Sequence, residues 1–131
     1  MIAIDTNILV RLITQDDAAQ AERAAALFER SPIFVSKTVL LETAWVLRFS
    51  YTLPQKLILK ALRTTAGLPQ VTVEDSVAVA GAFALIEAGM DFADALHLAS
   101  SRSATGFATF DLRMKKRADA AGTTACPVSV I

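Results

Sequence analysis

Cysteine and histidine are nearly absent from this chain of 131 residues, which contains one of each. With Cys126 alone, no intrachain disulfide can form, and a zinc site built from several cysteines is excluded. Because His97 is the one histidine, the chain offers few residues for a histidine-rich metal site or for Ser-His-Asp catalysis. We expect Cys126 to be a small buried thiol and His97 to lie on the polar side of its helix.

Neither charge is in excess, because 13 basic residues balance 13 acidic ones. Net charge therefore gives no indication of a nucleic-acid partner, and any basic surface must be local. Basic side chains could contact phosphates, although a solvated helix face is the simpler explanation for any single one of them. The local candidates are Arg11, Arg102 and the run Arg113, Lys115, Lys116 and Arg117.

Long hydrophobic runs are also missing. The longest, residues 77–86, is too short to span a bilayer, and Asp5 interrupts the apolar N-terminus too early for a signal peptide. We therefore expect a cytoplasmic protein with no membrane partner. Hydrophobic residues still make up 53% of the chain, and the mean hydropathy of +0.45 is high for a small protein. This amount of apolar surface predicts self-association.

Short apolar segments that favour strands alternate with longer segments that favour helices. Such alternation is typical of an α/β protein whose parallel sheet is covered by helices on both faces. The sequence has no repeats, low-complexity tracts or linkers, so we expect a single domain over residues 1–131. Strands are expected at residues 1–4, 33–36, 70–73, 106–110 and 127–131, and helices at 8–13, 17–29, 38–51, 54–66, 74–88, 91–102 and 112–121.

Residues 91–99 form the most informative of these helices. At about 100° per residue, the apolar side chains cover one face, and Asp94 falls at the border of that face, one turn from Asp91. A carboxylate at the edge of a buried face is costly unless its charge is compensated, and two acids three residues apart repel each other. A cation between these and other acids would relieve both penalties. Alternatively, Asp91 caps the helix and Asp94 is solvated.

Other acids stand where they could join this pair. Asp5 directly follows the first expected strand, and Asp111 directly follows the strand expected at residues 106–110. In open parallel sheets, sites form beyond the carboxyl ends of the strands, where helices also begin. We therefore expect Asp5, Asp111, Asp91 and Asp94 to open onto one edge of the sheet.

Glu42 is the fifth candidate acid. It lies near the start of the helix expected at residues 38–51, which is apolar nearly all round and is therefore expected to be buried. Its neighbours at helical spacing include Trp45, and no Lys or Arg lies three or four residues away. A favourable interaction with the helix dipole, about 0.5 kcal/mol, is small beside the several kcal/mol that burying an unpaired charge costs. We therefore expect Glu42 to have a partner.

A cluster of Asp5, Glu42, Asp94 and Asp111, with Asp91 near, suits a hard divalent cation. Oxygen ligands without His or Cys point to Mg²⁺ or Mn²⁺ rather than zinc. Such an ion activates water and neutralises charge developing on a phosphoryl oxygen, which implies phosphodiester hydrolysis. Three polar residues flank the acids and could orient carboxylates or waters, although each is also explained as a turn or cap residue: Thr6, Asn7 and Thr109.

Several segments, taken together, resemble the PIN domain family, and in particular the VapC-type toxins of bacterial type II toxin–antitoxin pairs. Each segment is a weak signal alone, but their order and spacing together are a strong one, and the resemblance spans residues 1 to about 120. The segments are Ile-Ala-Ile-Asp-Thr-Asn-Ile-Leu-Val-Arg-Leu at 2–12, Thr-Gln-Asp-Asp-Ala-Ala-Gln at 14–20, Leu-Leu-Glu-Thr-Ala-Trp-Val-Leu at 40–47, Asp-Phe-Ala-Asp-Ala-Leu-His-Leu-Ala at 91–99 and Thr-Phe-Asp at 109–111.

This resemblance implies a three-layer α/β/α sandwich with a central parallel sheet and an Mg²⁺- or Mn²⁺-dependent endoribonuclease. It places an acidic quartet on Asp5, Glu42, Asp94 and Asp111, of which the last is the looser position, and it matches Asp91 to an accessory acid of some relatives. It also implies a homodimer, an RNA substrate and a cognate VapB-type antitoxin whose C-terminal segment covers the site. Nothing in these residues chooses among tRNA, rRNA and mRNA as the target.

Other functions stay open at this point. A PIN domain nuclease that processes RNA outside a toxin pair would carry the same residues. A non-catalytic binding module could share the fold, although the presence of all four acids argues against a dead site. An aspartyl-phosphate phosphotransferase could use Asp5 as a nucleophile. Haloacid-dehalogenase-like enzymes of that class place a second Asp two residues later, where this chain has Asn7.

Overall fold

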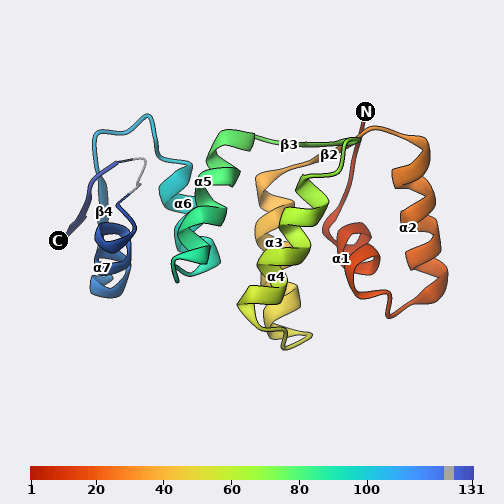
Figure 1. Ribbon diagram of the computed structural model, residues 1–131, viewed down its shortest axis with the longest axis horizontal. Helices are drawn as coiled ribbons and strands as arrows, with labels where there is room; N and C mark the ends of the chain where they lie inside the picture. Colours follow the sequence, from red (N-terminus) through yellow and green to blue (C-terminus); the bar gives the residue numbers. More distant parts are fainter. Residues whose placement is uncertain (123–125) are drawn as a thin grey trace. The chain divides into compact units, whose positions relative to one another are not determined.

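The computed structural model describes residues 1–122 and 126–131 and divides the chain into two compact units, residues 1–74 and residues 75–131 (Figure 1). Each strand and helix expected from the sequence is present. The first helix begins earlier than expected, at Thr6, because the Asp5 carboxylate caps it.

The first unit is built on a three-stranded sheet. Its elements are β1 (Ile2–Ala3), α1 (Thr6–Thr14), α2 (Ala18–Arg30), β2 (Ile33–Val35), α3 (Lys37–Phe49), α4 (Gln55–Ala66) and β3 (Val71–Val73). The strand order is β1-β2-β3, and both pairings are parallel, with Ile33 opposite Ile2 on one side and Val71 on the other. This agrees with the parallel pairing expected of an α/β chain.

The second unit is smaller. It contains α5 (Ser76–Glu87), α6 (Phe92–Ala99), β4 (Phe107–Thr109), α7 (Leu112–Ala121) and β5 (Val128–Val130). β4 and β5 pair in parallel, with Phe107 opposite Val128, and α7 packs against both strands while α5 packs against α6. In the part of the chain that the structure describes, no helix combines the length and the hydrophobicity needed to cross a membrane.

Caps and glycines fix the helix ends. The Asp17 carboxylate accepts a hydrogen bond from the backbone N–H of Gln20 at 3.0 Å, as the Asp-Ala-Ala-Gln pattern predicts. Gly89, just after α5, and Gly122, at the end of α7, have φ angles of +106° and +68°. Glycine adopts this left-handed conformation without a steric penalty, which explains why both helices stop where the sequence predicts.

In the first unit, the strands lead into helix starts at one edge of the sheet. β1 ends before Asp5, which caps α1, and β2 ends before Ser36, whose hydroxyl accepts a hydrogen bond from the N–H of Val39 in α3. After β3, the Glu74 carboxylate accepts a hydrogen bond from the backbone N–H of Lys37 at 2.9 Å. Because the strands are parallel, these three ends share one edge.

Aliphatic side chains fill the interior of each unit. In the first unit the most deeply buried include Leu9, Val10, Ile33, Val35, Leu40, Leu47 and Leu62, and in the second they include Leu85, Met90, Ala95 and Leu98. Two smaller expectations are confirmed, because Cys126 is a buried free thiol and His97 is exposed.

The expectation that α3 is buried all round is wrong. Its inner face consists of Leu40, Thr43, Ala44 and Leu47, which recur at helical spacing. The opposite side is in solvent, where Trp45 is 58% exposed and Phe49 is 61% exposed. The sequence could not show this, because apolar residues on both sides of a helix look alike whichever side meets the core.

A polar cluster links the end of α1 to the segment after α3. The Tyr51 hydroxyl donates to Asp16 Oδ2 at 2.5 Å, and Arg11 Nη1 donates to Asp16 Oδ1 at 3.0 Å and to the Tyr51 hydroxyl at 2.9 Å. The hydrogen bond from Tyr51, one from Thr14 and the charge of Arg11 hold the pKa of Asp16 below its ordinary value. Sequence reasoning missed this cluster, since its members meet only in the folded chain.

The two sides of α3 predict opposite effects of truncation on stability. Leu47→Ala leaves a cavity at a fully buried position and is expected to lower the free energy of unfolding by about 2–5 kcal/mol. Trp45→Ala removes an exposed ring and is expected to change it by about 1 kcal/mol at most. Urea unfolding of the two variants measures both values. A larger loss in Trp45→Ala than in Leu47→Ala would contradict the assignment of the two faces.

The Asp16 cluster predicts a pH dependence of stability. Because the folded-state pKa of Asp16 is lowered, its ionised form contributes stability above the ordinary pKa of 3.8, and that contribution is lost as the pH falls through the folded-state value. Asp16→Asn should therefore lower the melting temperature near neutral pH and lower it less well below pH 3.8. Glu22→Gln, on the exposed surface of α2, is the control. If Asp16→Asn changes the melting temperature by the same amount at both pH values, the ionised Asp16 does not stabilise the fold through this cluster.

Candidate functional site

Asp5 lies at the end of β1 and begins α1. Its Oδ1 atom accepts a hydrogen bond from the backbone N–H of Thr6 at 2.8 Å. This contact fixes the orientation of the carboxylate at the edge of the sheet where the sequence predicts a site. No hydrogen bond to Oδ2 occurs within residues 1–122 and 126–131, so this oxygen is available to a ligand.

Glu42 lies beside the start of α1. The Thr6 hydroxyl, which is itself buried, donates to Glu42 Oε1 at 2.5 Å. Since Thr6 is the residue after Asp5, this bond holds the first two predicted metal ligands in the same part of the first unit. Thr6 therefore orients a candidate acid, which was one of the two roles that the sequence allowed for it.

The surroundings of Glu42 differ from those that the sequence predicts. The sequence placed its carboxylate on a buried apolar stripe, whereas the residue is exposed, on the side of α3 away from Leu40 and Leu47. Its partner is a hydroxyl group from α1 rather than a basic residue. A hydroxyl donor leaves the negative charge in place, so Glu42 can still serve as an anionic ligand.

Asp91 and Asp111 cap two helices of the second unit. Asp91 Oδ2 accepts hydrogen bonds from the N–H groups of Ala93 and Asp94 at 3.1 and 3.4 Å. Asp111 Oδ1 accepts from the N–H of Arg113 at 2.8 Å, and its own N–H donates to the Thr109 hydroxyl at 3.0 Å. In each carboxylate the second oxygen makes no hydrogen bond within the described residues.

Asp94 carries the clearest electrostatic signal. Partial burial at the start of α6, followed by the negative charges of Asp91 and Asp111, raises the pKa of this carboxyl above its ordinary value. The positive charges of His97 and Arg117 offset only part of this shift. Three acids of the second unit therefore repel one another, which is the condition under which a bound cation is stabilising.

Thr109 and Asn7 are the other polar residues that flank the acids. Thr109 positions the backbone of Asp111 through its hydroxyl group. Asn7 lines a groove of about 410 Å³ between α1 and α2, two residues after Asp5. The basic side chains of this groove are Arg11, Arg23 and Arg30.

Two of the basic residues proposed for phosphate contacts are already paired. Arg11 binds Asp16, Gln20 and Tyr51, and Arg102 forms an ion pair with Asp75 at 3.0 Å. These partners neutralise part of the positive charge that the two residues would offer to a phosphate.

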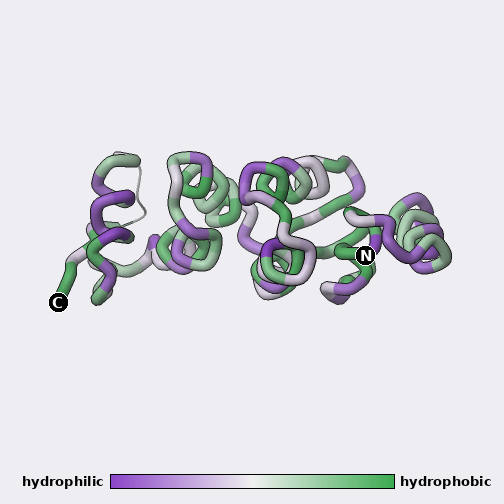
Figure 2. Tube along the Cα trace, turned by 90° about the horizontal axis from the view of Figure 1, so that it is seen from below, coloured by the Kyte–Doolittle hydropathy of each residue, from purple (hydrophilic) through white to green (hydrophobic). Residues whose placement is uncertain are grey.

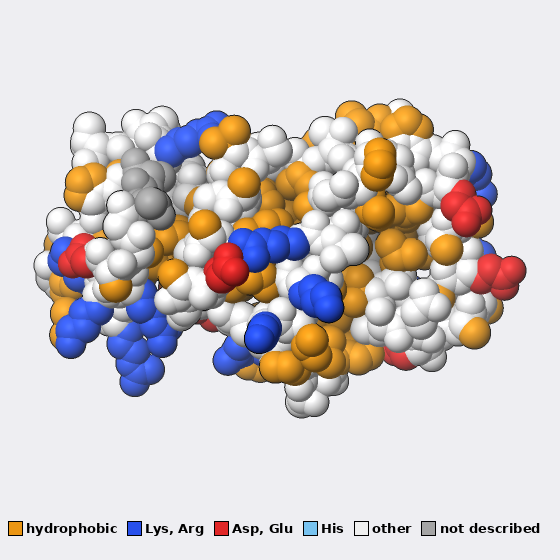
Figure 3. All heavy atoms as spheres, viewed as in Figure 1, with side chains coloured by type: hydrophobic (Ala, Val, Ile, Leu, Met, Phe, Trp, Pro, Cys, Tyr) orange, Lys and Arg blue, Asp and Glu red, His pale blue; other side chains and the backbone are white. Residues whose placement is uncertain are grey.

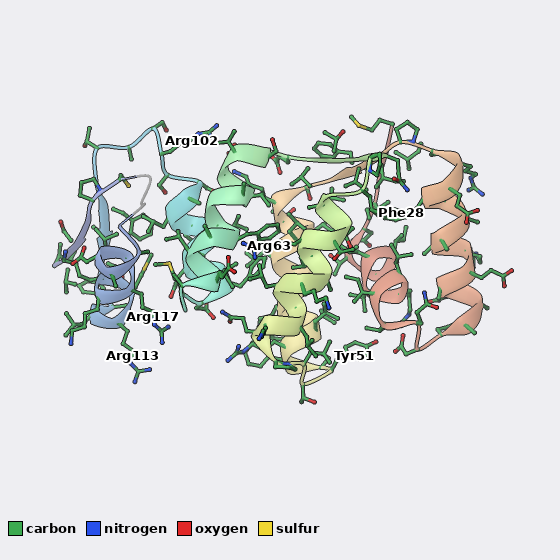
Figure 4. All side chains as sticks on the ribbon, viewed as in Figure 1. Phe28, Tyr51, Arg63, Arg102, Arg113 and Arg117 are labelled. Carbon is green, nitrogen blue, oxygen red and sulfur yellow. The ribbon has the colours of Figure 1, made fainter. Side chains whose placement is uncertain are left out.

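The basic run keeps several exposed cations on α7, whose trace alternates between hydrophilic and hydrophobic colours in Figure 2. Lys115 pairs with Asp119 at 2.7 Å, whereas Arg113, Lys116 and Arg117 have no ion pair within the described residues. Figure 4 shows Arg113 and Arg117 extending from this helix. These three residues stay candidates for binding phosphate.

The chemistry of the donors fits a hard divalent cation, because all five are carboxylates, and those of Asp5, Glu42, Asp91 and Asp111 are oriented by caps or by Thr6. Within residues 1–122 and 126–131, no three His, Cys, Asp or Glu side chains form a group that could hold a metal ion. The assignment of Asp5, Glu42, Asp94, Asp111 and Asp91 to a single metal site therefore stays a prediction.

Comparison with known families gives one finding. Residues 2–120 match the family model described as PIN domain. The α/β order of the elements and the parallel pairing of the strands are consistent with the three-layer α/β/α sandwich of that fold. No individual curated protein matches the chain.

The raised pKa of Asp94 predicts that its charge destabilises the metal-free protein. A carboxyl whose folded-state pKa is raised lowers stability as the pH rises through that value, so the penalty is present in full near neutral pH. In EDTA at neutral pH, Asp94→Asn should therefore unfold at a higher temperature than the wild type. Thermal unfolding followed by circular dichroism measures this.

Asp119→Asn is the matched control, because it removes an exposed acid that is already paired with Lys115. This variant should gain no stability. A melting temperature of Asp94→Asn at or below that of the wild type in EDTA would show that repulsion among these acids has no energetic consequence.

Proposed function

The chain belongs to the PIN domain family, and on that premise we propose that it is an Mg²⁺- or Mn²⁺-dependent endoribonuclease that acts as the toxin of a VapBC-type toxin–antitoxin pair. The PIN domain is generally a metal-dependent nuclease fold and suggests RNA binding. The observation that carries the proposal is that the family match, over residues 2–120, includes all five candidate acids. On this proposal, residues 1–131 act as a single nuclease domain.

In the proposed site, Asp5, Glu42, Asp94 and Asp111 hold the cation, and Asp91 assists. The local contacts of these acids support the roles. The caps fix one oxygen of Asp5, Asp91 and Asp111 and leave the other free, and Thr6 orients Glu42. The repulsion that raises the pKa of Asp94 is the penalty that a bound cation would remove.

When held by these acids, a divalent ion would supply Lewis-acid chemistry that activates water and neutralises charge developing on a phosphoryl oxygen. The residues of the chain provide the positioning. Thr6 and Thr109 hold Glu42 and the backbone of Asp111 in place, which limits the movement of the ligands when substrate binds. Arg113, Lys116 and Arg117 could attract the RNA backbone, with an affinity that falls as salt rises.

The partners follow from the same proposal. The substrate is RNA, the inhibitor is a cognate VapB-type antitoxin, and the active form is a homodimer. The hydrophobic content of the chain supports self-association, since apolar residues make up 53% of it and several large apolar side chains are exposed.

Replacing one ligand tests the catalytic role. Asp5→Asn keeps the size of the side chain and its capping oxygen but removes the charge that binds the cation. We expect RNA cleavage to fall by at least about 1,000-fold, since a metal ion contributes several kcal/mol to stabilising the transition state. Cleavage of an end-labelled single-stranded RNA with added Mg²⁺ or Mn²⁺ measures the rate. Induced expression in cells should arrest growth for the wild type but not for Asp5→Asn.

Glu29→Gln, on the exposed surface of α2, is the control for loss of an acid outside the site. Its cleavage rate should equal that of the wild type, and circular dichroism should show that both variants are folded. If folded Asp5→Asn cleaves RNA at the wild-type rate, the proposed mechanism is wrong.

A further inference from the structure

The outer face of α3 carries an aromatic pair that the proposed catalytic role does not use. The rings of Trp45 and Phe49 are 5.3 Å apart between centroids and tilted by 46° to each other. Both side chains are more than half exposed, with values of 58% and 61%. Two large rings held together in solvent form an exposed apolar surface, on a helix whose other side is packed in the core.

This aromatic pair shares its helix face with Glu42. The three residues are spaced at i, i+3 and i+7, so they lie within one narrow sector of α3. Glu42 is one turn nearer the helix start, where Thr6 holds it. A ligand that lies along this face would therefore contact the rings and a proposed metal ligand together.

One basic residue, Arg48, lies against the aromatic pair, and basic residues outnumber acids in the segment that forms α3 and α4. The Arg48 guanidinium lies 5.8 Å from the centroid of the Phe49 ring and donates to the Gln55 side chain at 3.2 Å. Within residues 37–66, Glu42 is the one acid, and the basic residues are Lys37, Arg48, Lys56, Lys60 and Arg63. On the face drawn in Figure 3, blue Lys and Arg side chains lie beside an orange hydrophobic patch near the lower ends of α3 and α4.

We propose that Trp45 and Phe49 form a platform on which a base of single-stranded RNA stacks, beside the Glu42 end of the catalytic site. This inference rests on the proposed ribonuclease function and adds a substrate-binding element to it. Aromatic side chains within a basic surface are the usual means of binding single-stranded nucleic acid, because the rings stack on bases and the cations attract phosphates. Stacking one base would set which phosphate lies at the acids.

A second copy of this chain is the competing occupant of the platform. Two copies meeting through this face would bring together their Arg48 side chains and two segments, residues 37–66, in which five basic residues outnumber the one acid, and this repulsion would oppose association. A polyanion with flat apolar groups complements both the rings and the cations. The proposed homodimer would then use another face of the molecule.

The platform can be observed directly, because Trp45 is the one tryptophan of the chain. The experiment titrates the Asp5→Asn variant, which should bind RNA without cleaving it, with a 12-nucleotide oligoadenylate and follows tryptophan fluorescence. Stacking should quench the emission in a saturable way. Polyphosphate and polyglutamate are the controls, because they carry the negative charge without bases and should not quench.

Two variants measure the contribution of the ring. Trp45→Ala should weaken binding of a labelled oligoadenylate by about 10-fold, whereas Trp45→Phe, which keeps an aromatic face, should restore most of the affinity. In the active protein, Trp45→Ala should raise KM and leave kcat nearly unchanged, since the ring binds substrate equally before and during the reaction.

The outcomes separate this inference from the proposed function. If the wild type cleaves RNA but oligoadenylate does not quench the fluorescence of Trp45, the proposed stacking platform is wrong and the proposed nuclease function is unaffected. Quenching without any cleavage by the wild type would support the platform and overturn the nuclease. Two results would overturn the platform. One is equal quenching by polyphosphate, which carries no bases. The other is tryptophan emission that changes with protein concentration alone, together with a dimer that is lost in Trp45→Ala.

Discussion

The common direction of the strands is the constraint on which the first unit depends. Because β1 and β2 are parallel, the residues that follow them, Asp5 and Ser36, lie at one edge of the sheet, and each begins a helix there. The first N–H groups of a helix need acceptors, which Asp and Ser side chains supply. The start of α1 and the first turns of α3 are thereby held together, close enough for Thr6 to bind Glu42.

Helix capping and metal binding are compatible uses of the same carboxylates. Asp5, Asp91 and Asp111 each give one oxygen to backbone N–H groups, and such a cap typically stabilises a helix by about 1 kcal/mol. The contact also removes rotational freedom from the side chain, so the second oxygen points in a fixed direction. A carboxylate oriented in this way loses less entropy on binding a cation than a free one. The sequence offered capping and ligation as alternatives, and the geometry allows both.

The sequence predicts the elements of the fold well because their signals are local. Strands, caps and glycine stops depend on neighbours within a few residues, as at Asp17 and Gly122. The features that the sequence did not predict depend on contacts between segments that are distant along the chain. The partner of Glu42 is a hydroxyl on another helix, and Arg11 is paired because Tyr51 reaches it in the folded chain. The exposure of Trp45 was also hidden, since hydropathy does not tell which apolar side of a helix faces the core.

The two faces of α3 are coupled through the helical repeat. Burial of Leu40 and Leu47 against the rest of the first unit fixes the rotation of the helix about its axis, because turning it would expose these side chains. That rotation decides where Glu42 and Trp45 point. A shift of one residue along the helix would turn the outer face by about 100° and separate the carboxylate from Thr6. The packing of the core therefore sets the alignment of an acid and an aromatic surface that lie outside it.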